Sequence, residues 1–99
     1  MADQDVLDVL SFTQDMMVCV LEGHWDDLIE MQLKQDQMIK VLFSDTERSF
    51  LDRDKENLFE VQRLNQEILN AAELHKAEIA SKLRDMRQGK YKAGAYQAL

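Results

Sequence analysis

The scarcity of residues that interrupt a helix is the feature that most limits the folds open to this chain. Its 99 residues include no proline and three glycines. Leucine, alanine, glutamate, glutamine, lysine, arginine and methionine, which all favour helix, supply much of the sequence. Aromatic and β-branched residues, which favour strands, are sparse. The sequence therefore predicts an all-α fold.

The length of the chain and its apolar content indicate a single small domain. A chain of 99 residues is enough for one domain with a modest core. The hydrophobic content of 45% is too high for a disordered chain. No apolar run approaches the ~20 residues that span a bilayer, and the acidic N-terminus is unlike a signal peptide. We therefore expect a cytoplasmic protein.

Apolar residues recur at helical spacing over three segments, residues 3–22, 24–43 and 54–88. The first segment has a face that consists of Val6, Leu10, Thr13, Met17 and Val20/Leu21. The second has a stripe that consists of Trp25, Leu28, Ile29, Gln32, Asp36, Ile39, Leu42 and Phe43. Gly23 stands between these two segments, at the position after a helix end where a left-handed conformation favours glycine.

The third segment is the longest, and its apolar residues repeat at alternating steps of three and four. This heptad-like seam consists of Leu58, Val61, Asn65, Ile68, Ala72, His75, Ile79, Lys82/Leu83 and Met86. Before it, Ser44 and Glu47 have the spacing of a capping box. Residues 44–54 are either a short helical turn or a loop held by Phe50 and Leu51. We expect an antiparallel bundle over residues 1–88 and a flexible basic tail, or a short fourth helix, over residues 89–99.

A difference in helix length indicates where another chain binds. The first two helices span about 30 Å each and the third about 50 Å, so the third extends beyond its neighbours from near His75. Its stripe of Ile79, Leu83 and Met86 then lacks a partner within one chain. A dimer, a fourth helix folded back, or another protein would each bury it. The alternative without a function is a shorter third helix with a frayed end.

Charge is distributed unevenly along the chain. The net charge is −7, but residues 82–99 carry +4, which leaves −11 for the other 81 residues. The basic residues Lys82, Arg84 and Arg87 provide a polar rim for the apolar stripe. A basic end on an acidic body favours a protein contact or self-docking over nucleic-acid binding.

Residues that carry out chemistry are isolated in this sequence. His24 and His75 lie far apart and Cys19 is the single cysteine, so no spacing matches a zinc site and no intramolecular disulfide forms. We expect Cys19 to be an inert thiol that is buried or half-buried. Neither a glycine-rich phosphate loop nor a nucleophile elbow is present. We therefore predict no enzyme activity, no catalytic residue, no metal and no cofactor.

Two segments resemble the FliT family of flagellar export chaperones. The first is Leu21-Glu-Gly-His-Trp-Asp-Asp-Leu-Ile-Glu30, which continues through Lys34, Asp36, Met38 and Ile39 to Leu42-Phe43. The second is Leu83-Arg-Asp-Met-Arg-Gln-Gly-Lys90, followed by Ala93, Ala95 and Tyr96. The chain departs from the family at Gln35, where many members carry arginine, and in residues 44–54, which lack the proline often found there.

The resemblance implies a function and a set of partners. Such chaperones bind the C-terminal part of the filament-cap protein FliD, prevent its premature assembly and aid its delivery to the export apparatus. Some members contact the export ATPase complex, the export gate or the flagellar master transcription regulator. In the family the C-terminal region, residues 79–96 here, masks a hydrophobic groove. The predicted partner-binding residues are Ile79, Lys82, Leu83, Met86, Arg87, Tyr91 and Tyr96.

Three functional hypotheses remain open from the sequence. In the first, an amphipathic cargo helix lies in a groove between the second and third helices, and the C-terminal segment competes for it. In the second, the chain sequesters the flagellar master regulator and has no part in export. In the third, the chain is a structural homodimer whose seam completes a core.

Overall fold

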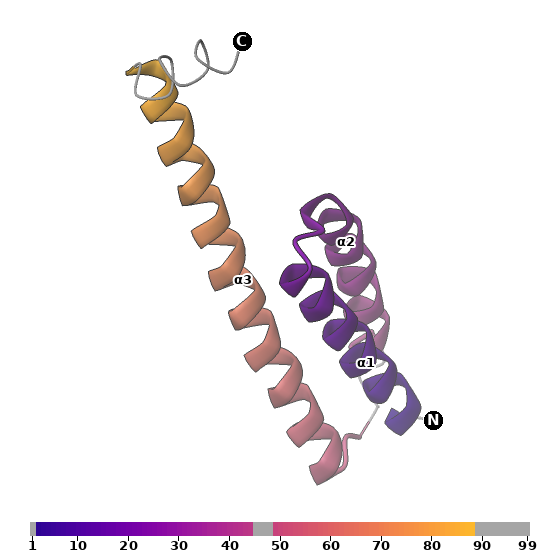
Figure 1. Ribbon diagram of the computed structural model, residues 1–99. Coiled ribbons are helices and arrows are strands. Elements are labelled where there is room, and N and C mark those ends of the chain that lie inside the picture. The colour runs from indigo at the N-terminus through magenta and orange to yellow at the C-terminus, as the bar shows by residue number, and fades with distance from the viewer. Residues whose placement is uncertain (1, 45–48, 89–99) are drawn as a thin grey trace. The chain divides into compact units, whose positions relative to one another are not determined.

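Three helices make up the fold in a computed structural model that describes residues 2–44 and 49–88. They are α1 (Ala2–Leu21), α2 (Trp25–Leu42) and α3 (Asp52–Arg87) (Figure 1). No strand occurs in these described ranges, so the all-α prediction is confirmed, and each helix lies where hydrophobic spacing predicted it. The chain divides into two compact units, Met1–Leu69 and Asn70–Leu99.

The corner between α1 and α2 is a Schellman motif. Gly23 adopts a positive φ of 75°, as its position predicted. Its N–H donates to the Val20 carbonyl at 3.1 Å, and the His24 N–H donates to the Cys19 carbonyl at 2.9 Å. These two bonds satisfy carbonyls that the end of α1 would otherwise leave unpaired. The corner therefore ends α1 and allows α2 to begin at Trp25 and pack beside it (Figure 1).

All three helices contribute to the core of the first unit. Val6 and Val9 of α1, Leu42 of α2 and Val61 of α3 are each at least 96% buried and form one cluster. Half-buried apolar residues pack against this cluster, namely Leu10, Met38, Ile39, Phe50 and Leu58. The α3 residues of the first unit are thereby attached to α1 and α2 through apolar contacts.

The predicted stripe on α2 is partly wrong. Ile29 and Phe43 are 63% and 54% exposed, and Gln32 and Asp36 also face solvent. The buried residues of α2 are Leu28, Gln35 and Leu42. They recur every seven residues, which places them on one side of a helix. The buried face of α2 therefore includes a glutamine, Gln35, which the pattern of apolar residues did not predict.

A buried aspartate stabilises the start of α3. Asp54 is 1% exposed, and its Oδ2 accepts a hydrogen bond of 2.9 Å from the backbone N–H of Leu51. In this hydrogen bond the side chain of the third helical residue accepts from the backbone of the residue before the helix, as in a capping box. The capping box predicted for Ser44 and Glu47 involves other residues. The Ser44 hydroxyl donates to the Val41 carbonyl of the preceding helix at 2.7 Å. Glu47 lies outside the described residues.

The segment before α3 is held by one of the two residues expected to hold it. Phe50 is half-buried and its ring lies 5.5 Å from that of Phe43, at an angle of 60°. Leu51 is 54% exposed. The long third helix is confirmed as far as Arg87. The expected tail or fourth helix, residues 89–99, lies outside the part of the chain that the structure describes.

Candidate protein-binding surfaces

The second unit contains the apolar stripe that the sequence predicted, here called the distal stripe and defined as Ile79, Leu83 and Met86. All three lie on α3, and their spacing of four and three residues places them on one side of it. Their exposed fractions are 46%, 48% and 59%. Apolar side chains this accessible at helical spacing are available to pack against another chain.

Basic side chains flank the distal stripe. Lys82, Arg84 and Arg87 are all exposed, and Arg84 and Arg87 line a shallow cavity of about 310 Å³ together with Ala80 and Leu83. Two of the predicted partner-binding residues, Leu83 and Arg87, thus line the same cavity. Of the other predicted partner-binding residues, Tyr91 and Tyr96 lie outside the described residues.

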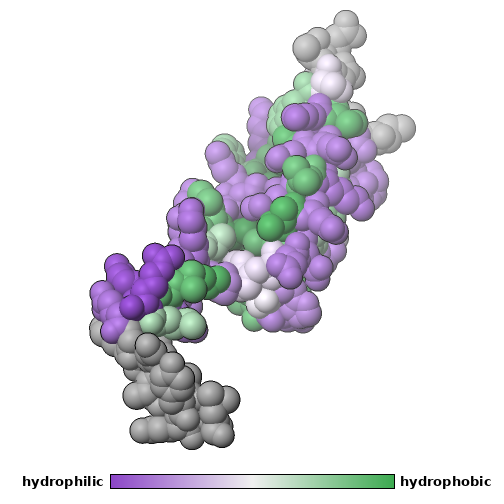
Figure 2. Space-filling model, turned by 90° about the horizontal axis from the view of Figure 1, so that it is seen from above, coloured by the Kyte–Doolittle hydropathy of each residue, from purple (hydrophilic) through white to green (hydrophobic). Residues whose placement is uncertain are grey.

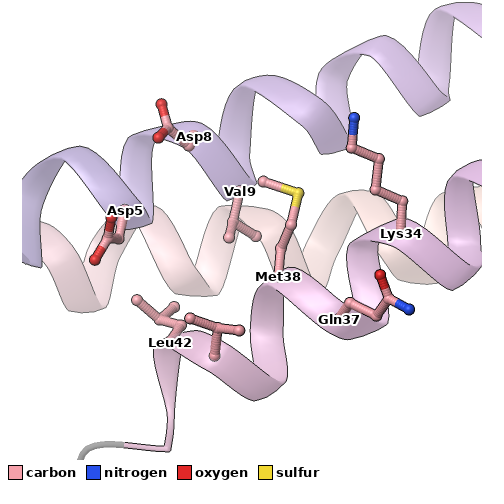
Figure 3. A pocket seen from close by; sticks show the side chains of 8 residues that line it. Asp5, Asp8, Val9, Lys34, Gln37, Met38 and Leu42 are labelled. Atoms are coloured by element: carbon pink, nitrogen blue, oxygen red, sulfur yellow. The ribbon is translucent and has the colours of Figure 1, made fainter.

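A second surface, which the sequence did not predict, lies between α1 and α2 in the first unit. We call it the α1–α2 groove (Figure 3). It encloses about 320 Å³ and is lined by Asp5, Asp8, Val9, Lys34, Gln37, Met38, Val41 and Leu42. The signal that would have found it is the pair Asp5 and Asp8, one turn apart beside the core residue Val9. An aspartate such as Asp5 near the start of a helix also favours the positive end of the helix dipole, so its place in the sequence does not by itself indicate a groove.

A polar network joins the three helices within the core of the first unit. The Gln35 side-chain amide donates to the Thr13 hydroxyl at 2.7 Å and to the Asn65 carbonyl oxygen at 2.9 Å. The Thr13 hydroxyl in turn donates to the Val9 carbonyl at 2.8 Å. Thr13 and Gln35 are 0% and 4% exposed. These bonds offset the cost of burying an amide and a hydroxyl.

Cys19 behaves as the inert thiol that the sequence predicted. It is 8% exposed, and its Sγ donates to the His24 carbonyl at 2.9 Å. Burial raises the pKa of the thiol, and the negative charges of Asp27 and Glu22 raise it further. Because the thiolate is the reactive species, a raised pKa makes this cysteine a poor nucleophile at neutral pH.

His24, another candidate for chemistry, lies on the surface. His24 lies 3.6 Å from a Glu22 carboxylate oxygen and 3.7 Å from one of Asp27, and all three side chains are exposed. Within residues 2–44 and 49–88, no three His, Cys, Asp or Glu side chains gather as a metal site would require. In the same ranges no helix has the length and apolar content to cross a bilayer.

The face of the molecule seen in Figure 2 is a mixture of polar and apolar side chains. Large apolar residues that are at least half exposed occur on every helix, and examples are Val18, Leu33, Phe59 and Leu74. Single exposed residues of this kind are ordinary on a soluble protein. The distal stripe and the α1–α2 groove differ from them because several apolar side chains gather there beside charged ones.

These features define a small helical protein with no catalytic constellation among its described residues and with two accessible apolar surfaces. The chain belongs to the FliT family of flagellar proteins, whose model matches residues 4–98. Membership implies a chaperone associated with the flagellum. No curated protein and no solved structure matches the chain significantly.

Proposed function

We propose that the chain is a flagellar type III export chaperone that works in the cytoplasm. It holds the C-terminal segment of the filament-cap protein FliD, prevents premature assembly of that protein and aids its delivery to the export apparatus. Family membership supports the flagellar role. The observation that supports protein binding is the distal stripe, whose three apolar side chains are about half exposed beside basic residues.

The cargo segment binds as an amphipathic helix in this proposal. A helix buries apolar anchors at steps of three and four residues, and the distal stripe offers matching anchors at the same steps. Acidic residues at the edge of the cargo helix pair with Lys82 and Arg87. The bundle is antiparallel in this arrangement, and the C-terminal residues up to Tyr96 compete with cargo for the stripe. Contacts with the export ATPase complex or the export gate follow cargo capture.

The substitution Leu83→Glu tests the cargo site. Burial of a leucine side chain contributes about 1.5–3 kcal/mol, so its loss weakens binding of the FliD C-terminal peptide roughly 10- to 100-fold. Calorimetry with the full chain measures this change. Leu74→Glu is the matched control, because Leu74 is 63% exposed and lies on another side of the same part of α3. Equal affinities for the two variants would show that cargo does not bind the distal stripe.

Two further measurements separate this proposal from its alternatives. Proteins that co-purify from motile cells include export components if the chain is an export chaperone. If the master transcription regulator alone co-purifies, the chain is instead a protein that sequesters this regulator. Sedimentation over a range of dilutions addresses the homodimer, since an obligate dimer loses helicity as it dissociates.

A further inference from the structure

The α1–α2 groove has the composition of a second docking site. Its floor is apolar: Val9 and Leu42 are each 1% exposed, and Met38 is half-buried between them and the solvent. Val41, at 69% exposed, provides the most accessible apolar surface of the groove. In Figure 3 the Met38 thioether extends from α2 towards Val9 of α1. A methionine in this place can adapt its shape to an incoming side chain.

The two edges of the groove differ in charge. Asp5 and Asp8 stand one turn apart on the α1 edge, and Gln4 Nε2 donates to Asp8 Oδ1 at 2.8 Å. The α2 edge has Gln37 and Lys34, but the Lys34 ammonium lies 5.4 Å from the centre of the Phe12 ring. This cation is therefore already engaged by an aromatic face. The lining of the groove thus contains two carboxylates and one ammonium group, so its net charge is negative, with the carboxylates on the α1 edge.

The dimensions of the groove suit a short helix. Its α2 wall runs from Lys34 to Leu42, which corresponds to about 12 Å, or roughly two helical turns. A volume of about 320 Å³ accommodates a few protruding side chains. A cleft between two packed helices with an apolar floor is the setting in which an amphipathic helix binds through residues on one face.

We propose that the α1–α2 groove binds a short amphipathic helix of another protein, one whose apolar face is bordered by lysine or arginine. The charge of the groove selects this occupant, because basic side chains at its edge pair with Asp5 and Asp8, whereas acidic ones are repelled. The inference is independent of the proposed function, which concerns the distal stripe of the second unit. A chain with both sites binds two helices. The helix on the distal stripe has acidic residues beside its apolar face, and the helix in the α1–α2 groove has basic ones.

The test uses the full chain and two designed peptides labelled with fluorescein. Both peptides are 14 residues long with a leucine face, and the edge of that face carries lysine in one and glutamate in the other. Fluorescence anisotropy measures binding. We expect the lysine peptide to bind at least tenfold more tightly than the glutamate peptide. Equal affinities, or no binding of the lysine peptide at millimolar concentration, would overturn the proposal.

A pair of double variants separates the groove from general attraction to an acidic protein. Asp5→Asn with Asp8→Asn weakens binding of the lysine peptide at least fivefold. Asp36→Asn with Glu56→Gln changes the net charge equally at exposed positions outside the lining of the groove, and it weakens binding less than twofold. Equal losses in the two double variants contradict a groove site. Circular dichroism before each titration checks that both variants are folded.

The position of the peptide on the unaltered chain provides a measurement that does not depend on any variant. NMR chemical shifts change at Val9, Met38 and Val41 if the peptide lies in the α1–α2 groove. Changes centred on Ile79 and Leu83 instead would show that the distal stripe binds it, and would overturn the proposal. A dimer of the free chain that the lysine peptide dissociates would assign the groove to a second copy of this chain, which also contradicts the proposal.

Discussion

At the scale of single residues, Gln35 is hydrogen-bonded to both of the other helices. Its amide is 4% exposed and donates to Thr13 of α1 and to Asn65 of α3. A buried amide favours the one arrangement of helices in which its partners are within reach, because any other arrangement leaves polar groups unpaired. In this chain an uncharged side chain therefore joins all three helices.

The substitution Gln35→Leu tests this role. We expect it to lower the free energy of unfolding by about 1–3 kcal/mol, because two hydrogen bonds are lost and the buried Thr13 hydroxyl loses a donor. Gln32→Leu is the matched control, since Gln32 is exposed on the same helix. It should change stability by less than about 0.5 kcal/mol. Urea denaturation monitored by circular dichroism measures both. If Gln32→Leu lowered the free energy of unfolding more than Gln35→Leu, Gln32 would lie on the buried face of α2, as the sequence predicted.

At the scale of elements, the ends of the helices are determined by local chemistry. The Schellman motif at Gly23 satisfies carbonyls of α1, and Asp54 accepts from the N–H of Leu51, the residue before α3. On the surface of α3, Arg63 pairs with Glu60 and with Glu67, one turn away on either side. The Arg63 guanidinium lowers the pKa of the exposed Glu60 carboxyl through a hydrogen bond. Exposed pairs of this kind contribute little to stability.

The substitution Gly23→Ala tests the corner between α1 and α2. An alanine at φ 75° is strained, although a Cβ at this position would meet no atom within 4 Å. We therefore expect a loss of about 1 kcal/mol that arises from the backbone alone. Gly23→Asn should cost less, because asparagine tolerates the left-handed conformation better. Thermal unfolding of the three proteins measures the order. Equal stabilities would show that the corner relaxes into another conformation.

At the scale of the whole molecule, the two units differ in how their apolar residues are buried. In the first unit each helix contributes to a cluster that is almost wholly buried. In the second unit Leu74, Ile79, Leu83 and Met86 are 46–63% exposed. A segment with little buried apolar surface opens at low free-energy cost, and this is where binding segments are commonly found. The well-buried residues of the first unit and the less buried segment thus share one helix, α3.

Amide hydrogen exchange of the full chain tests this difference. The amides of Val61 and Ile68 should exchange at least tenfold more slowly than those of Ile79 and Leu83, because the latter residues lie in the less buried segment. Addition of the FliD C-terminal peptide should slow exchange in residues 79–87 and leave residues 58–68 unchanged. Strong protection of residues 79–87 in the dilute free chain would show that the distal stripe is already covered.

Much of the fold could be predicted because it depends on neighbours in the sequence. The three helices follow from spacing and from the absence of proline, and the corner follows from Gly23. The sequence predicts the distal stripe from helix length, and α3 with 36 residues is indeed longer than α1 with 20 and α2 with 18. Each of these is a local property, or a comparison of lengths, and needs no knowledge of which side chains meet.

Tertiary structure decided the features that depend on which side chains meet. Hydrophobic spacing placed Gln32 and Asp36 on the core face of α2, because it cannot anticipate that a glutamine will find two partners 22 and 30 residues away. The α1–α2 groove is likewise formed by residues near the start of α1 and by residues in the second half of α2, which only packing brings together. The sequence alone therefore determined the helices, their corner and the distal stripe. Packing decided the face of α2 and the second surface, because burial of a polar group depends on partners that only the folded chain brings within reach.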